Sequence, residues 1–296
     1  RGRVTCLDLP RFYRDEYFKL ARLVQHLDNE VAGTKADSAD DVVLAALVTF
    51  SQREGSWLKV ASGAKLACLE GVALRAAESA HEESRLFVEF GAFVGYSALA
   101  VARLVPRGAR LRSMELDAVH VVVARHITSI ARLRVDVSFN VGHAHDLMPS
   151  LIEECGMRTM AFLFMDHSNS RFHDELDSIE RLVVGAPCSE VLADNVLKPG
   201  APLFVWAATH RFAGQASQSL APVAWAMSEF RHAGQEDWMV VVDASPPHME
   251  PAPATTQPRC IEAAESEASK RLVDQDIFTW RWSWPDRSRR HSGAGS

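Results

Sequence analysis

Short apolar runs alternate with longer stretches of helical spacing through the middle of the chain. Continuous apolar runs bounded by glycine or polar residues are typical of strands that are buried on both faces. Segments with the period of a helix, at 97–104 and 119–133, follow the first two runs. This alternation predicts an α/β fold, a mostly parallel sheet with helices on both faces. The expected strands are 86–90, 111–115, 135–141, 160–165, 190–193 and 238–242.

Three further helices are expected before the first strand. Aromatic residues at 12–18 indicate a short helix, and apolar residues at 40–50 and 64–80 recur at helical spacing. Acidic residues at 37–41 suit the positive N-terminus of the second helix. Beyond the fifth strand, the apolar run at 203–206 continues the fold.

The character of the sequence changes after residue 243. Residues 245–258 are rich in proline and small side chains, as linkers are, and 262–272 has the composition of a helix. The last residues, 287–296, have the composition of a disordered tail. We therefore divide the chain into an N-terminal extension, a main domain, and a segment of linker, helix and tail: 1–21, 22–243 and 244–296.

Composition and charge narrow the functional classes. With 47% apolar and 24% charged residues, the chain has ample material for a globular core. A net charge of -6 argues against nucleic acid as a partner, because phosphates require a basic surface. No apolar run approaches the roughly 20 residues that span a bilayer. The five cysteines are scattered and form no CxxC pair, so neither a zinc site nor a disulfide framework is indicated. We expect a monomer in the reducing cytoplasm.

A glycine loop lies between the first strand and the helix that follows it. The segment from Glu89 to Ser97 contains Gly91 and Gly95, which let the backbone turn sharply and approach a ligand. Glu115 ends the next strand, where an acidic side chain can hold both hydroxyls of a ribose. The alternative is a tight turn without a ligand. The spacing Glu-x-Gly-x-x-x-Gly differs from the loop that cradles a pyrophosphate, and therefore favours S-adenosylmethionine over NAD.

Oxygen-bearing side chains follow two further strands. Asp166 ends the fourth strand, and Asp194 and Asn195 end the fifth. Three hard oxygen ligands at one edge of a sheet suit Mg²⁺. The alternative is that Asp166 caps a helix while Asp194 and Asn195 form a turn.

Taken together, these motifs resemble the catechol O-methyltransferase family. The resemblance runs from about residue 22 to residue 243, and its most specific stretch is Ala-Asp-Asn-Val-x-x-Pro-Gly-Ala-Pro at 193–202. The N-terminal part agrees at Val24-Gln25-His26 and at 54–57. The other matching motifs are Glu89 to Ser97, Met114-Glu115, Val141-Gly142 and Met165-Asp166-His167. The resemblance implies a Rossmann-like methyltransferase fold and transfer of a methyl group from S-adenosylmethionine to a catechol-like small molecule.

The resemblance implies a set of residues around the methyl donor. Ser97 would lie near the carboxylate of its methionine part, and Glu115 would bind the ribose. The serine and glutamine that contact adenine in the family correspond here to Ala144 and His145, so adenine recognition is altered. The whole implied set is Val60, Glu89, Gly91, Tyr96, Ser97, Glu115, Gly142, Ala144, His145, Asp166 and His167.

An acceptor site for a catechol-like molecule is implied as well. Mg²⁺ would be held by Asp166, Asp194 and Asn195. Trp57 and Pro199 match two hydrophobic residues that flank the flat ring in the family.

The catalytic positions depart from the family pattern. After Asp166-His167 the family has a tryptophan and then the catalytic lysine, whereas this chain has Ser168 and Asn169. An amide cannot accept the hydroxyl proton as a lysine of lowered pKa can. His167 and Glu229 complete the implied catalytic set with Asn169, Glu229 matching an acid that hydrogen-bonds a substrate hydroxyl.

The acceptor proton therefore needs another route. His167, His173, Lys59 and Lys198 are candidate bases, and packing or a solvated surface is the alternative role of each. A general base is worth about 10²–10⁴ in rate. A metal ion orients both hydroxyls and lowers the pKa of the one to be methylated. We hypothesise that metal activation dominates and that activity survives the loss of the lysine.

The sequence is compatible with three hypotheses of function. The first is an active O-methyltransferase, which retention of all three candidate metal ligands favours. The second is a non-catalytic relative that keeps the cofactor pocket as a binding module, which the loss of the lysine favours. The third is a nicotinamide-dependent oxidoreductase, which the glycine spacing disfavours.

Overall fold

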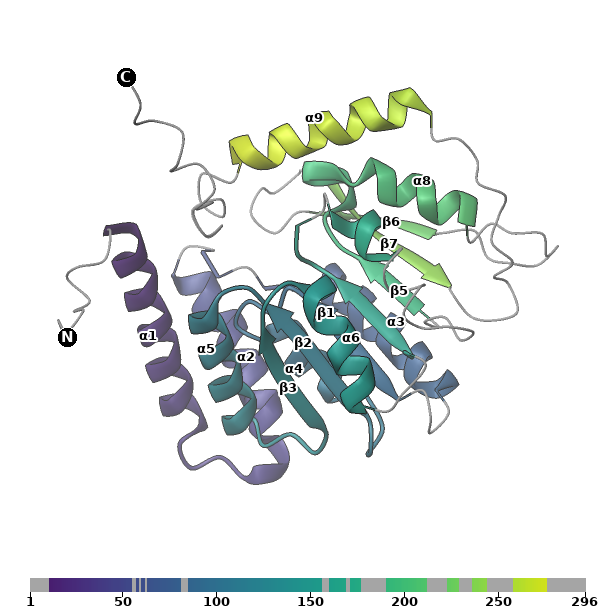
Figure 1. Ribbon diagram of the computed structural model, residues 1–296. Helices are drawn as coiled ribbons and strands as arrows, with labels where there is room; N and C mark the ends of the chain where they lie inside the picture. The colour runs from purple at the N-terminus through teal and green to yellow at the C-terminus, as the bar shows by residue number, and fades with distance from the viewer. Residues whose placement is uncertain are drawn as a thin grey trace, which may run out of the picture.

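One mixed sheet dominates the protein, and within the described residues it has seven strands in the order β3-β2-β1-β4-β5-β7-β6 (Figure 1). Strands β1 to β5 pair in parallel, and β6 and β7 are antiparallel additions at one edge. The computed structural model describes residues 11–54, 57–58, 60–61, 63–80, 85–155, 160–168, 171–176, 190–211, 223–228, 236–243 and 258–275. The strands are β1 Leu86–Phe90, β2 Arg110–Glu115, β3 Asp136–Val141, β4 Phe162–Met165, β5 Glu190–Ala193, β6 Val223–Ser228 and β7 Glu236–Asp243.

Helices cover both faces of this sheet, as the alternating pattern predicts (Figure 1). Apolar residues of α3, α4 and α5 pack on one face, and those of α6 and α8 on the other. Helices α1 and α2 form a further layer against the outer sides of α4 and α5. The helices are α1 Arg11–Val31, α2 Ala39–Arg53, α3 Ala64–Ser79, α4 Tyr96–Ala102, α5 Ala118–Ile130, α6 Ala144–Cys155, α8 Pro202–Arg211 and α9 Arg259–Gln275.

The register of the parallel strands brings their carboxyl ends level with one another. Phe90 pairs with Met114 on one side and with Met165 on the other. Met165 in turn pairs with Ala193. The residues that come directly after these positions therefore leave the sheet side by side, at the edge where ligands bind in sheets of this type.

The C-terminal helix α9 packs on α8, although the sequence analysis placed it in the segment after the main domain. The backbone amide of Leu203, at the start of α8, donates to the Glu265 carboxylate of α9 over 3.1 Å. Gly200 lies so close to α9 that a Cβ added to it would be 3.3 Å from the Cβ of Ala268. Helix α9 thus holds the chain that follows β5.

Two elements differ from the expectation drawn from the sequence. Helix α1 runs for 21 residues, rather than forming a short helix around 12–18. Strand β6 was not expected, and the apolar run at 203–206 belongs to helix α8. Within the described part of the chain, none of the helices has the length and apolar character that crossing a membrane requires.

Candidate functional site

The glycine loop after β1 lies directly against the end of β4. Gly91 has a φ of 96°, a conformation that side-chain-bearing residues rarely adopt. A Cβ at this position would be 2.4 Å from the backbone oxygen of Asp166. The amide of Gly91 donates to the carbonyl of Met114 in β2 over 2.9 Å. The loop is therefore fixed between β2 and β4, and its first residue has room for glycine only.

This geometry predicts a clear effect for Gly91→Ala. The positive φ and the contact with the Asp166 carbonyl should together lower the free energy of unfolding by about 2 kcal/mol. Urea unfolding measures this loss. Gly71→Ala in α3 is the matched control, because nothing lies within 4 Å of its added Cβ. Alanine in a helix is also favoured over glycine, so the control should be as stable as the wild type or more so. Equal stabilities of the two variants would contradict the described geometry.

Glu89 is a buried carboxyl group beneath the loop. Its side chain is only 3% exposed and accepts hydrogen bonds from the hydroxyls of Ser97 and Ser113. Burial raises the pKa of Glu89 to about 7, although the two hydroxyl hydrogen bonds oppose the rise. Glu89 ties the start of α4 to β2, and it is partly protonated at neutral pH.

Glu115, at the end of β2, keeps its charge. Its carboxylate accepts the backbone amides of Phe93 over 2.8 Å and Asp117 over 2.9 Å. Burial acts to raise the pKa of Glu115, but His120 and the two amides outweigh it and lower the pKa below its ordinary value. An ionised carboxylate beside the glycine loop can accept hydrogen bonds from the two hydroxyls of a ribose.

His120 of α5 carries the positive charge that faces Glu115. Its Nδ1 is 3.8 Å from Glu115, and its Nε2 is 3.5 Å from Glu16 of α1. Burial acts to lower the pKa of His120, but the two carboxylates reverse this and raise the pKa to about 9. The ring meets Phe93 edge-on at 4.7 Å between centroids. His120 therefore links the glycine loop to the helical layer formed by α1.

The three candidate metal ligands come together at the ends of β4 and β5. The amide Nδ2 of Asn195 donates to Oδ1 of Asp166 over 2.9 Å, and the backbone amide of Asn195 donates to Oδ1 of Asp194 over 2.7 Å. Asn195 has a φ of 57°, a left-handed conformation that asparagine tolerates better than most residues. Across the described ranges, no three His, Cys, Asp or Glu side chains form a metal-binding group. The candidate set instead combines two carboxylates with one amide.

Lys65 of α3 also belongs to this centre, and the sequence analysis did not single it out. Its Nζ is 2.9 Å from Oδ1 of Asp194, and Lys65 itself is 7% exposed. Burial raises the pKa of Asp194, and the Lys65 ammonium opposes the rise. A sequence signal for Lys65 did exist. It lies three and four residues before Cys68 and Leu69, which are buried on the same face of α3, so the pattern puts a charge on an apolar face.

His167 is held by packing and by a carboxylate. Its Nε2 contacts a carboxylate oxygen of Glu175, which is buried. The ring meets Phe90 edge-on at 5.5 Å and lies 5.1 Å from the ring of Phe172. Glu175 fixes how the imidazole is oriented, a role that was not expected from the sequence.

The remaining cofactor residues surround the glycine loop and the end of β3. Tyr96 and Ser97 are buried in the first turn of α4, and Val60 is buried before α3. Gly142 follows β3, Ala144 is buried at the start of α6, and the exposed His145 contacts Asp146. Their roles in binding the cofactor stay predictions.

The two expected gate residues lie on different segments. Trp57 is half-buried, meets Phe50 edge-on at 6.2 Å, and has Nζ of Lys19 5.7 Å from its ring. Pro199 lies in the turn η5 (Val196–Gly200), which follows β5. The predicted catalytic residues Asn169 and Glu229 lie outside the described residues, as does the candidate base Lys59.

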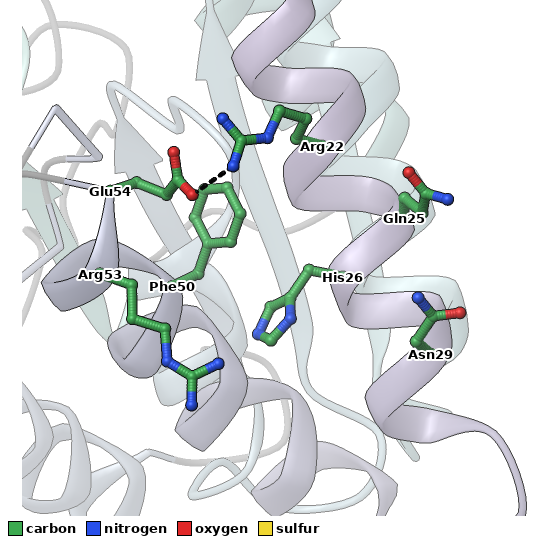
Figure 2. Close-up of a pocket in the computed structure, with 7 residues that line it drawn as sticks. All are labelled: Arg22, Gln25, His26, Asn29, Phe50, Arg53 and Glu54. Atoms are coloured by element: carbon green, nitrogen blue, oxygen red, sulfur yellow. Dashed lines mark hydrogen bonds and ion pairs between the residues drawn. The ribbon is translucent and has the colours of Figure 1, made fainter.

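A separate cavity of about 260 Å³ lies between α1 and α2 (Figure 2). An ion pair of 2.6 Å between Arg22 and Glu54 spans part of it. Its lining contains none of the expected site residues. The lining residues are Arg22, Gln25, His26, Asn29, Phe50, Arg53 and Glu54.

Comparison with known sequences points to one family. The family model described as O-methyltransferase matches residues 74–203. A probable O-methyltransferase of Mycobacterium tuberculosis is 32% identical over 182 residues, which cover 60% of this chain and 74% of the relative. The catechol O-methyltransferase of Bos taurus is 30% identical over 188 residues, covering 63% of this chain and 65% of the relative. That of Mus musculus is 35% identical over 120 residues, covering 40% of this chain and 45% of the relative. The match thus spans less than two thirds of both catechol O-methyltransferases.

Solved structures share the fold. An O-methyltransferase from Bacillus cereus in complex with SAH has a TM-score of 0.50 and 18% identity, covering 75% of this chain and 97% of that one. The O-methyltransferase TomG from Streptomyces achromogenes, in complex with SAM, has a TM-score of 0.52 and 18% identity, covering 68% and 89%. At such identity the likeness shows the fold alone. The expected Rossmann-like methyltransferase fold is confirmed.

Proposed function

Because this chain belongs to the O-methyltransferase family, we propose that it transfers a methyl group from S-adenosylmethionine to a hydroxyl of a small molecule. The observation that carries this proposal is the ionised, part-buried Glu115 beside a glycine loop that has no room for a side chain at Gly91. The carboxylate accepts two ribose hydroxyls, and the loop lets the donor approach the backbone. The relatives that bind SAM or SAH share this fold and support the choice of donor.

Binding of S-adenosylhomocysteine, compared with that of NAD, tests the donor. In isothermal titration calorimetry we expect S-adenosylhomocysteine to bind and NAD to show no heat of binding under the same conditions. The donor amino acid would lie near Ser97, and adenine near Gly142, Ala144 and His145. Preferential binding of NAD would contradict the proposal.

The acceptor we propose is a catechol-like molecule held at Asp166, Asp194 and Asn195. These side chains fit Mg²⁺ in chemistry, because they offer hard oxygen donors, and in place, because Asn195 contacts both aspartates. When bound there, Mg²⁺ would supply orientation of both hydroxyls and a lower pKa for the one that attacks. Trp57 and Pro199 would confine the flat ring, so that the hydroxyl oxygen lies in line with the donor methyl group.

Loss of the hydroxyl proton does not require Asn169 in this account. His167 is the nearest titratable candidate to Asp166 in sequence, and Glu175 fixes the orientation of its imidazole. Solvent water could also take the proton from a hydroxyl whose pKa a bound Mg²⁺ would lower. Residues of this chain then chiefly bind and orient the two reactants.

The variant Asn169→Lys tests whether methyl transfer needs a side-chain base at this position. Suppose that a cation at Asp166, Asp194 and Asn195 (the acidic centre) supplies most of the activation of the acceptor hydroxyl. Restoring the family's lysine should then change kcat by less than about tenfold, because a further base adds little. The measurement is initial-rate methyl transfer under saturating Mg²⁺, with Lys270→Asn as a control for a change of charge on an exposed side chain. A rise of about 10²–10⁴, the usual worth of a general base, would show instead that the missing lysine limits the wild type.

A further inference from the structure

The ammonium of Lys65 lies among oxygen atoms that the proposed acceptor site would use. Its Nζ is 2.9 Å from Oδ1 of Asp194 and 3.5 Å from Oδ1 of Asn195. Both residues belong to the proposed magnesium ligands. A third oxygen, Oδ2 of Asp237, is also 3.5 Å away. An ammonium has three N–H donors, so Lys65 can donate to each of these oxygens.

Asp237 is held independently of the acidic centre. This residue of β7 has no exposed surface, and its Oδ1 accepts the backbone amides of Leu197, Lys198 and Trp238 at 3.2, 3.1 and 2.7 Å. Three amide hydrogen bonds fix the carboxylate while Oδ2 faces Lys65. Asp237 is therefore a stationary second anion for the ammonium, outside the proposed ligand set.

Lys65 and a divalent cation would draw on the same oxygens. Asp194 cannot give its full charge to a metal ion while its Oδ1 is 2.9 Å from an ammonium, and the two cations repel each other at short range. The cost is largest in a buried site, where solvent screens little, and both side chains are almost fully buried. Metal binding here thus requires that Lys65 give up part of its contact with Asp194.

We propose that Lys65 competes with a divalent cation for Asp194 and Asn195, and that Asp237 receives the ammonium when the cation binds. Lys65 is then a positioning residue that sets how tightly the acidic centre holds the cation. The proposal rests on the proposed function in one respect only, the assignment of the cation site to Asp166, Asp194 and Asn195.

Binding of Mn²⁺ to Lys65→Met tests this directly, because methionine keeps the length of the side chain without its charge. Free Mn²⁺ is counted by electron paramagnetic resonance, independently of activity. We expect the dissociation constant for Mn²⁺ to fall by about tenfold or more, since one nearby charge commonly shifts a binding equilibrium by that amount. Lys270→Met is the control, because Lys270 is 70% exposed on α9, and it should bind Mn²⁺ like the wild type. An unchanged or weaker affinity in Lys65→Met would overturn the proposal.

A double variant keeps the proposal testable if Lys65→Met alone does not fold. Lys65→Met leaves two buried carboxylates without their ammonium, whereas Lys65→Met combined with Asp237→Asn removes one of those charges as well. The double variant should also bind Mn²⁺ more tightly than the wild type. If either protein is soluble only in Mn²⁺, the metal has replaced the ammonium and the proposal stands. Insolubility of both in Mn²⁺ and in chelator alike would overturn it.

Calorimetric titration with S-adenosylhomocysteine on the same samples distinguishes a failure of the proposed function from a failure of the role proposed for Lys65. A wild type that does not bind S-adenosylhomocysteine counts against the proposed function. Normal binding of S-adenosylhomocysteine, with the same Mn²⁺ affinity in wild type and Lys65→Met, counts against the role of Lys65 alone.

Discussion

Glu115→Ala should lower the affinity for S-adenosylhomocysteine by about 10²–10⁴. Two hydrogen bonds to a charged group contribute about 1.5–3 kcal/mol each, and both would be lost with the carboxylate. The carboxylate also accepts the amides of Phe93 and Asp117, so its removal loosens the glycine loop in the same step. Isothermal titration calorimetry gives the dissociation constant.

One further variant separates the effect of the charge from that of the whole side chain, and a second serves as a control. Glu115→Gln keeps one acceptor oxygen and removes the charge, so its loss should be smaller, about tenfold. Glu78→Gln removes an exposed carboxylate from α3 and should leave the affinity unchanged. Wild-type affinity in Glu115→Ala would show that the donor does not lie at the end of β2.

Glu89→Gln should make the protein more stable at pH 8 by about 3 kcal/mol. The folded-state pKa of Glu89 is raised from 4.5 to about 7, so the folded protein binds its proton more tightly than the unfolded chain does. Stability from this group is full below about pH 4.5 and is lost as the pH rises through about 7. A shift of about 2.5 pKa units corresponds to about 3 kcal/mol. The glutamine variant does not lose this stability. Urea unfolding from pH 4.5 to 8 measures how the free energy of unfolding changes with pH in the wild type and in the variant.

A second slope should remain in that variant, and His120 contributes to it. Its folded-state pKa of about 9 lies above its ordinary value of 6.5. The stability that it contributes is full below about pH 6.5 and is lost as the pH rises through 9. Glu78→Gln should reproduce the wild-type profile at every pH. If Glu89→Gln shows the same slope between pH 4.5 and 7 as the wild type, then Glu89 is ionised throughout that range.

The central strands β1 and β4 could be predicted from the sequence because they are buried on both faces. β1 was expected at 86–90 and is found there, with all of its residues buried. The apolar segment of β6 fits a strand or a helix equally well by its pattern, and only its pairing with β7 at the sheet edge decides. The run at 203–206 posed the same ambiguity and is helical.

The candidate site could be predicted only as far as positions at strand ends. Asp166, Asp194 and Asn195 were expected at one edge, and the pairing of Met165 with Ala193 brings them together. The contacts of Lys65 with Asp194 and Asp237 span 129 and 172 positions of the sequence. Nothing local in the sequence indicates such distant pairs, because they depend on how α3 crosses the sheet and on β7 joining β5.

Transfer of a labelled methyl group from S-adenosylmethionine to a panel of catechols tests the central claim most directly. We expect labelled product with wild-type protein and Mg²⁺, little product in chelator, and little with Glu115→Ala. No product from any catechol, by a protein shown to bind S-adenosylhomocysteine, would contradict it.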